Sequence, residues 1–266
     1  MQPSRDRVLA ASAAWAFLPP DAPRVETEEY LLVRYPDWTE RPLQLVRFHP
    51  RRPAGEVLPE VLAHARELAP QGGRAVEDVA CWVRLDAPAD VEPALRAAGA
   101  RLDETVDVLA LGLDRTPDLG DLPGVVLRWS ADLEVFADAV RLSAEVFGAG
   151  PTDRRDLEAA HPGEVAKVRS GGGGAVVAYD GDRPVGSGGL TMAGRDARLW
   201  GGVVHPAARG RGIYRAVLAA RLAYAVDRGA DLALVKGRVE TSGPVLRRAG
   251  FVPHGQERSW LLALGA

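Results

Sequence analysis

The sequence is short of the residue types on which several chemistries depend. Cys81 is the one cysteine among 266 residues, which excludes an intrachain disulfide and any metal site built on several cysteines. The five histidines are scattered, and no pair has the helical spacing of a zinc site. We therefore expect no bound metal and a cytoplasmic protein, because thiols stay reduced there.

A surplus of positive charge is also missing. The net charge is -3, whereas a nucleic-acid-binding protein usually carries a basic surplus. Of the 33 basic residues only Lys167 and Lys236 are lysines, and the rest are arginines. We expect no nucleic-acid partner.

A long apolar segment is absent as well. The run from Val8 to Leu18 follows Arg5 and Arg7 and weakly resembles a secretory signal, but Pro19-Pro20 follows it rather than a small-residue cleavage site. The segment is better interpreted as an amphipathic helix that includes Trp15 and Phe17, and we expect no membrane association.

Residues 114–123 (DRTPDLGDLP) are rich in Pro, Gly and Asp and predict a linker between residues 1–113 and residues 124–266. The chain length suits two domains. The second part predicts an α+β fold with a mixed, mostly antiparallel sheet and flanking helices. Its expected strands are residues 125–129, 175–179, 185–192, 197–204, 232–236, a short one near 251 and 260–264, and its expected helices are 133–147, 153–170, 212–227 and 244–249.

The two parts share a pattern. Phe48-His49-Pro50 and the apolar positions after it align without gaps on Val204-His205-Pro206 and its followers, 156 residues later. A second block, Pro93 to Gly99, aligns on Pro244 to Gly250 at an offset of 151. Two blocks in the same order predict a duplicated fold, with one unit in residues 1–113 and the other in residues 124–266.

The loop between Val204 and the helix expected from residue 212 carries the clearest functional signal. A helix begins directly after two glycines, and its first turn offers unpaired N–H groups and the positive end of the helix dipole to a phosphate. Gly210 and Gly212 let the backbone approach an anion, while Arg209 and Arg211 add positive charge.

Two common phosphate-binding motifs do not fit. A dinucleotide-binding loop needs a third glycine where Arg215 stands, and an acidic residue at the end of the next strand, where Lys236 stands. A Walker loop needs Gly-Lys-Ser/Thr, which is absent.

The segment resembles the acyl-CoA loop of the GNAT superfamily of N-acetyltransferases, which reads Arg/Gln-x-x-Gly-x-Gly/Ala. Arg209, Gly212 and Tyr214 fill these places, although Tyr214 replaces a small residue. Downstream, Gly250-Phe251 also fits, so the resemblance covers residues 125–266. It implies an acyltransferase with acetyl-CoA as cosubstrate and a small-molecule or peptide amine as acceptor. The residues that it implies for acetyl-CoA binding are Gly202, Val203, Val204, Arg209, Gly210, Arg211, Gly212, Ile213 and Tyr214.

The catalytic groups of the family are not recognisable. Val239 and Leu246 stand where many members have an Asn and a Tyr, and Trp200 and Gly201 stand where a carboxylate often activates the amine. We assign no catalytic residue. The nearest candidates by position are Asp196, His205 and Glu240, and the segment 147–155 is expected to line the acceptor side.

The first unit lacks the phosphate loop. Pro53, Ala54 and Glu56 stand where the second unit has Arg209, Gly210 and Gly212, and a carboxylate at a helix start repels phosphate. We therefore expect a degenerate first unit. Two alternatives to an N-acetyltransferase remain: a non-catalytic acyl-CoA-binding or sensing protein, and a structural protein that has lost CoA binding, against which the intact loop argues.

Overall fold

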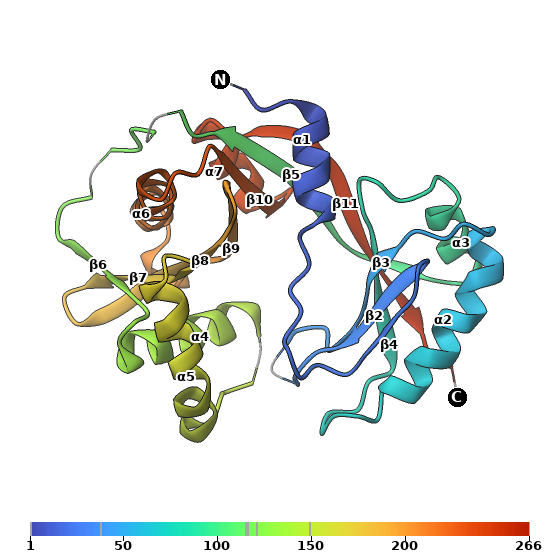
Figure 1. Cartoon of the computed structure of the whole chain (residues 1–266). Coiled ribbons are helices and arrows are strands. Elements are labelled where there is room, and N and C mark those ends of the chain that lie inside the picture. The colour runs from blue at the N-terminus through green and yellow to red at the C-terminus, as the bar shows by residue number, and fades with distance from the viewer. Residues whose placement is uncertain (1, 38, 115–116, 121, 149, 266) are drawn as a thin grey trace. The chain divides into compact units, whose positions relative to one another are not determined.

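The computed structural model describes residues 2–37, 39–114, 117–120, 122–148 and 150–265 (Figure 1). The chain forms two compact units, each of several segments. The C-terminal unit comprises Met1–Val8, Leu109–Lys236 and Pro244–Pro253. The N-terminal unit comprises Leu9–Val108, Gly237–Gly243 and His254–Ala266.

The C-terminal unit contains a mixed sheet. The strands β6 (Val125–Trp129), β7 (Gly173–Asp180), β8 (Arg183–Ala193) and β9 (Asp196–Val204) are antiparallel neighbours in chain order. β10 (Leu232–Arg238) then pairs with β9 in parallel. β7 and β8 are joined by a tight turn in which Gly181 has a φ of 60°, as Asp180-Gly181 predicts.

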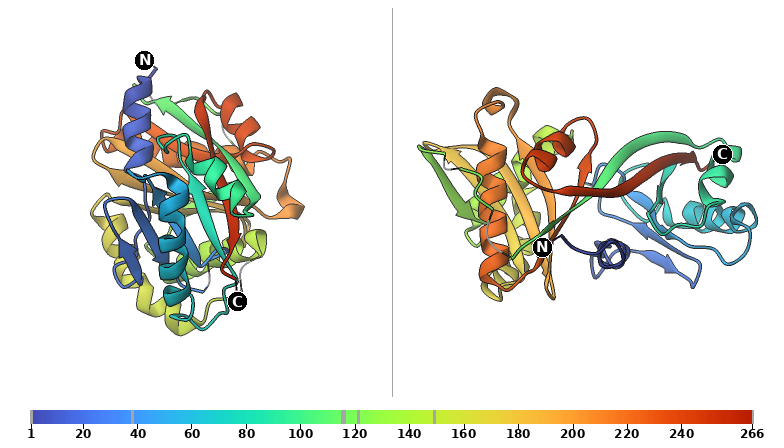
Figure 2. Two further views of the ribbon diagram at one scale, coloured as in Figure 1. Left: turned by 90° about the vertical axis from the view of Figure 1, so that its right-hand side faces the viewer. Right: turned by 90° about the horizontal axis from the view of Figure 1, so that it is seen from above.

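Helices cover both faces of this sheet (Figures 1 and 2). α6 (Ile213–Asp227) packs Val217, Leu218 and Leu222 against one face. α4 (Leu133–Phe147) packs on the other, and α5 (Arg154–Arg169) lies beside it. The sheet is therefore enclosed, as a mostly apolar strand set requires.

The N-terminal unit is built in the same way. Its sheet contains β1 (Arg24–Glu26), β2 (Tyr30–Arg34), β3 (Leu43–Phe48) and β4 (Asp78–Val83). The pairs β1–β2 and β2–β3 are antiparallel, and β3–β4 is parallel. α2 (Ala54–Leu68) and α3 (Val91–Ala97) contribute Val57, Val61 and Leu95 to the core on one face.

The order β3–α2–β4–α3–β5 repeats as β9–α6–β10–α7–β11, where β5 is Arg101–Gly112, α7 is Ser242–Arg248 and β11 is Val252–Ala263. In both runs the first two strands are parallel and flank the long helix in sequence. This repetition confirms the predicted fold of two related α+β units.

The closing strands depart from a contiguous arrangement. β11 pairs through Arg258–Ala263 with β4, so most of it belongs to the N-terminal unit. Leu109–Gly112 of β5 belong to the C-terminal unit, where β5 lies next to β10 in the strand order β5-β10-β9-β8-β7-β6. The division into domains 1–113 and 124–266 with linker 114–123 stays a prediction, and the compact units exchange segments across it.

Two local expectations differ from the structure, and a third element keeps its expected extent although a proline lies inside it. β11 is one strand rather than the two expected near 251 and at 260–264. The polar residues between them stay extended and continue into Arg258–Ala263, which pairs with β4. α1 (Arg5–Ala13) ends before Phe17, whose ring instead stacks on Tyr35 with centroids 6.1 Å apart. α5 continues through Pro162, which removes one helical hydrogen bond.

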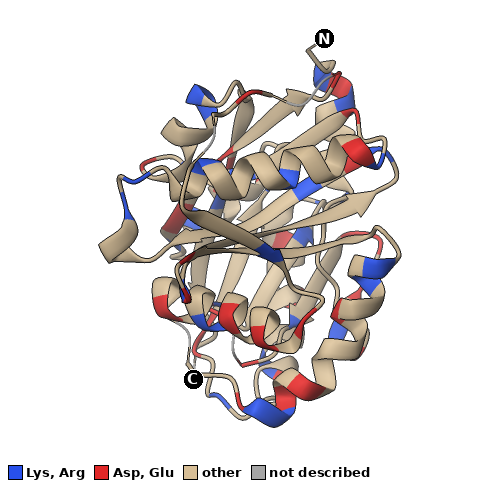
Figure 3. Cartoon of the chain, turned by 90° about the vertical axis from the view of Figure 1, so that its left-hand side faces the viewer, with Lys and Arg blue, Asp and Glu red and all other residues tan. Residues whose placement is uncertain are grey.

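Surface charges of both signs are interspersed along the helices in the view of Figure 3. Arg154 and Glu158 on α5, for example, form an exposed pair one turn apart, with Nε and Oε1 separated by 2.9 Å. Exposed pairs of this kind are screened by solvent and gain little free energy. The charge pattern therefore adds little to stability.

Candidate active site

A tight turn follows β9. The 3-10 helix η1 (Pro206–Ala208) comes directly after His205, whose backbone N–H donates to the Val185 carbonyl at 3.0 Å. The Nδ1 atom of His205 accepts from the Ala207 N–H at 3.2 Å. This histidine shapes the turn, and its position does not favour a role as base.

The loop then reaches α6 through two glycines in the left-handed region. Gly210 has a φ of 77° and Gly212 a φ of 84°, conformations that few other residues adopt. A Cβ added to Gly210 would meet no atom within 4 Å, so the backbone there is open to a ligand.

The N-terminus of α6 is uncapped. Gly212 is its N-cap residue and provides no side chain to bond the first turn, whose N–H groups have no acceptor within the helix. The dipole of the helix adds positive potential at the same point. The arrangement can bind an anion such as a pyrophosphate.

Three exposed arginines surround this helix start. Arg211 donates from Nη2 to Oδ2 of Asp180 at 2.8 Å, an exposed pair that a phosphate can displace at little cost. Arg209 and Arg215 form no ion pair within the described part of the chain. The loop predicted to hold the donor therefore combines free N–H groups with free positive charge.

Beside this loop, the neighbouring strands β9 and β10 stop pairing. β9 and β10 pair only from Asp196 opposite Leu232 to Leu199 opposite Val235. Farther along, β9 has a bulge, because its pairing with β8 skips Gly201 and Gly202, and Gly201 has a φ of 60°. The β9 edge facing β10 beyond Leu199 thus lacks a paired strand among the described residues and is available to an extended ligand.

A buried cation supports the bulge from the α6 side. The Arg221 side chain is 1% exposed, and its Nη1 donates to the carbonyls of Gly189 (3.2 Å) and Trp200 (3.4 Å). Burial lowers its pKa, and the nearby Tyr214 phenol opposes this shift. Its Nη2 has no hydrogen-bond partner among the described residues. The guanidinium ties α6 to both strands at the bulge.

A second cluster lies on the opposite face of β9. Trp200 is 38% exposed, and its Nε1 donates to Oγ1 of Thr191 at 3.0 Å. The Nζ atom of Lys167, on α5, lies 5.0 Å from the centre of the Trp200 ring. Burial lowers the pKa of Lys167, which Glu164 partly offsets. Lys167 is not among the site residues predicted from the sequence, and the signal available for it was the rarity of lysine in this chain.

The other residues considered from sequence lie apart from the bulge. Asp196 begins β9, eight residues before the strand's end, and binds Arg7 with Oδ1 and Nη2 3.0 Å apart. Glu240 is exposed in the turn after β10. Leu246 is fully buried in the apolar core. The expected acceptor segment 147–155 includes Ala149, which lies outside the described residues.

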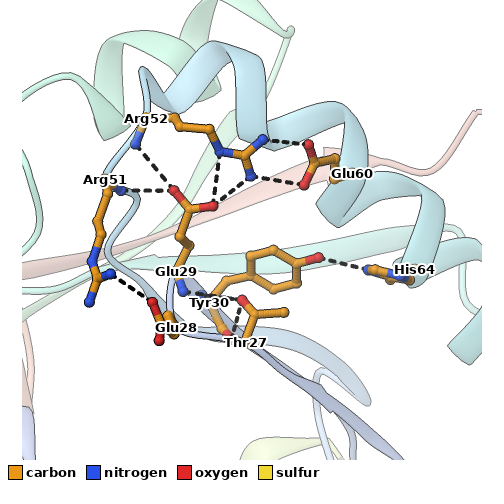
Figure 4. Close-up of polar contacts among 8 residues, drawn as sticks. All are labelled: Thr27, Glu28, Glu29, Tyr30, Arg51, Arg52, Glu60 and His64. Carbon is orange, nitrogen blue, oxygen red and sulfur yellow. Dashed lines mark hydrogen bonds and ion pairs between the residues drawn. The ribbon is translucent and has the colours of Figure 1, made fainter.

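In the N-terminal unit, the loop before α2 corresponds to the glycine loop, and a carboxylate of the chain itself occupies its N–H groups (Figure 4). The Glu29 carboxylate accepts from the backbone N–H groups of Arg51 (2.9 Å) and Arg52 (3.1 Å) and from the Arg52 guanidinium. These contacts, above all the guanidinium, lower the pKa of Glu29 to about 2.

The Ala54 N–H, at the start of α2, donates to Oδ2 of Asp90 at 2.8 Å. Two carboxylates of the chain, those of Asp90 and Glu29, therefore lie where a phosphate would have to bind, and Glu56 adds a third in the first turn. These carboxylates give a physical reason why the N-terminal unit is a degenerate copy without a phosphate site.

Comparison with known proteins agrees with this geometry. Residues 140–251 match the model of the "Acetyltransferase (GNAT) family". This part of the chain is therefore similar in sequence to the GNAT acetyltransferases. The match includes β9, the glycine loop, α6 and β10, which are the elements that form the candidate site.

Solved GNAT structures share the fold over the whole chain. A GCN5-related N-acetyltransferase from Kribbella flavida is similar with a TM-score of 0.66 and 17% identity, over 98% of this chain and 93% of that one. One from Sphaerobacter thermophilus has a TM-score of 0.66 and 18% identity, over 99% and 86%. A tandem GNAT protein from the clavulanic acid biosynthesis pathway has a TM-score of 0.61 and 18% identity, over 94% and 86%. No curated protein matches the sequence.

The described residues contain no group of three or more His, Cys, Asp or Glu side chains that could hold a metal ion. In the same part of the chain, no helix has both the length and the apolar character needed to cross a membrane.

Proposed function

We propose that the protein is a cytoplasmic, acetyl-CoA-dependent N-acetyltransferase that acts on a primary amine of a small molecule or peptide by direct acyl transfer. The observation that carries this proposal is the uncapped start of α6 behind Gly210 and Gly212, beside the open edge of β9. A site of this form suits a ligand that has both a pyrophosphate and an extended arm.

The donor would bind along these two features. The N–H groups of residues 210–214, with Arg209 and Arg211, would hold the pyrophosphate. The free edge of β9 at Gly202–Val204 would hydrogen-bond the arm. Of Val203 and Val204, Val204 has its backbone N–H on this free edge, because the N–H of His205, the next residue, points to β8; the Val204 N–H would also stabilise negative charge on the reacting carbonyl oxygen.

The thiolate leaving group needs little assistance from the protein. A thiol has a pKa of about 8.5, so its anion leaves readily without a dedicated acid. Leu246, buried in the core, offers none at the family's usual place. The acceptor amine is different, because it must lose a proton to attack.

A non-catalytic acyl-CoA-binding protein is the second candidate. What favours it is that Trp200 and Gly201 occupy the strand positions at which a carboxylate would activate the amine, while the donor loop is intact. The two candidates differ in turnover and not in donor binding.

The test measures thermal unfolding with and without acetyl-CoA, together with acetylation of a panel of amines. A ligand in hundredfold excess over its Kd adds about 2.7 kcal/mol to the free energy of unfolding. Gly212→Glu should abolish this stabilisation because its carboxylate repels phosphate. Gly212→Asn is the matched control, since asparagine tolerates the left-handed backbone without adding charge.

An equal thermal shift in the wild type and in Gly212→Glu would place the donor site elsewhere. A normal shift without acetylation of any amine would favour the binding protein. Acetylation that Gly212→Glu removes and Gly212→Asn retains would support the enzyme.

A further inference from the structure

The chain has only two lysines, and both lie where the pairing of β9 with β10 ends. Lys236 directly follows Val235, the last β10 residue paired with β9, and Lys167 lies over Trp200, the first β9 residue beyond that pairing. All other basic residues are arginines, which do not lose their proton in proteins. A lysine supplies charge as arginine does, and it can also titrate.

Lys167 is held at a defined place. Its Nζ lies 5.0 Å from the centre of the Trp200 ring, and Trp200 itself is fixed by its hydrogen bond to Thr191. The bulge at Gly201 follows directly. The ring keeps Nζ in position in either protonation state, as a cation over the π face or as an amine whose N–H points to it.

No carboxylate forms an ion pair with Lys167 in the described part of the chain. The nearest on its own helix, Glu164, accepts hydrogen bonds from Ser130 Oγ and from the Ala175 N–H (3.1 Å). The Oε1 atom of Glu164 is therefore bound to Ser130 and to β7, and Glu164 forms no ion pair with Lys167 among the described residues.

The other elements around Lys167 do not supply that counter-ion. On β9, Arg198 is two residues before Trp200 and so shares its face, and it adds positive charge. On α4, Asp138 is bound to the Tyr179 hydroxyl and to Arg141. Burial without a bound carboxylate disfavours the protonated amine, in agreement with its lowered pKa.

We propose that Lys167 is the general base of the transfer, a role that rests on the proposed acetyltransferase function. Its neutral Nζ accepts a proton from the acceptor nitrogen as that nitrogen attacks the thioester carbon. An N–H bond of the acceptor breaks and an Nζ–H bond forms. The new C–N bond replaces the C–S bond, and the electron pair of the C–S bond leaves on sulfur. Lys167 then releases its proton to solvent.

Two variants separate this role from simple charge. Lys167→Arg keeps the positive charge and the contact with Trp200 but cannot act as a base. Lys167→Met removes the positive charge as well as the base. We expect each to lower kcat by about 100-fold or more at pH 7, with the thermal shift by acetyl-CoA unchanged. Their rates should approach the wild-type rate at high pH, where the acceptor amine is already neutral. Arg169→Met, which removes an exposed cation two residues farther along α5, should behave as the wild type.

A second measurement does not depend on turnover. Protein labelled with 15N-lysine gives two side-chain signals, and Lys167→Arg identifies the one from Lys167. We expect that signal to titrate below the ordinary lysine pKa of about 10.4.

Titration at or above the ordinary value would overturn the proposal. So would full activity in Lys167→Arg; if Lys167→Met alone were impaired, Lys167 would instead anchor an anionic acceptor. Absence of acetylation by the wild type with every amine would refute the proposed function itself, and the proposal for Lys167 with it.

Discussion

The ring of Tyr214 lies against Gly202, so closely that a Cβ on Gly202 would come within 2.9 Å of it. Tyr214 is in the first turn of α6, and Gly202 is in the bulge of β9. The start of the anion-binding helix and the bent strand are therefore in direct contact. The effect on stability of a substitution at one of these residues should therefore depend on the side chain at the other.

Gly202→Ala should destabilise the protein by about 1–3 kcal/mol, because the added methyl group overlaps the ring. Tyr214→Ala removes the obstacle, so the double variant should be more stable than the sum of the two single effects. Denaturant unfolding of the four proteins gives the coupling energy. Strict additivity would mean that the ring does not rest on Gly202.

The protein should bind one acetyl-CoA per chain. In the N-terminal unit the loop before α2 already bonds the carboxylate of Glu29, and the first residue of α2 bonds that of Asp90, so both carboxylates exclude a phosphate. Calorimetric titration should give a stoichiometry near one for the wild type and no binding for Gly212→Glu. A stoichiometry near two would contradict the assignment of the N-terminal unit as degenerate.

Glu29→Gln should lower the melting temperature at neutral pH. The pKa of Glu29 is lowered to about 2 in the folded protein, whereas an unfolded glutamate has a value of about 4.3. Its stabilising contribution is therefore complete above about pH 5 and is lost as the pH falls toward 2.

The difference in melting temperature between Glu29→Gln and the wild type should shrink over the same range. Glu28→Gln is the matched control, because the Glu28 carboxylate bonds only the exposed Arg51 guanidinium among its described contacts. A pH-independent difference, or an equal effect of Glu28→Gln, would show that the contacts of Glu29 do not stabilise the fold.

Leu262→Ala should destabilise the N-terminal unit by about 2–5 kcal/mol, although Leu262 lies far along the sequence, because it is buried in that unit's core. Hydrogen exchange should accelerate at Val79–Val83 in β4 while the amides of β8 stay protected. Leu218→Ala, in the core under α6, should show the reverse. Faster exchange only in β8 after Leu262→Ala would refute the placement of β11.

Much of the C-terminal unit can be predicted from the sequence because its signals are local. The helix expected at 133–147 occupies those residues, since Asp132 caps its start and Gly148 has the left-handed conformation that ends it. The glycine loop is equally local, because Gly210 and Gly212 and the helix after them are adjacent in sequence.

The features that escaped prediction depend on contacts between distant residues. The alternating pattern of β11 shows that it is a strand but does not say which strand it pairs with, and β4 is more than 150 residues away. Lys167 and Trp200 come from different elements, so no spacing in the sequence reports their contact. The same holds for Glu29, which lies just before β2 and bonds the loop that precedes α2.

The pairing of β11 with β4 has a consequence for the order of events during synthesis. The N-terminal unit contains residues 9–108 but obtains an internal strand of its sheet only from residues 254–263. A nascent chain that has emerged only through β4 therefore presents an unpaired strand edge, the kind of surface that associates with other chains. Most of the C-terminal unit is translated between these two segments. We expect it to acquire its structure first, and the half of the molecule made earliest to be the last to become protected from chaperones and proteases.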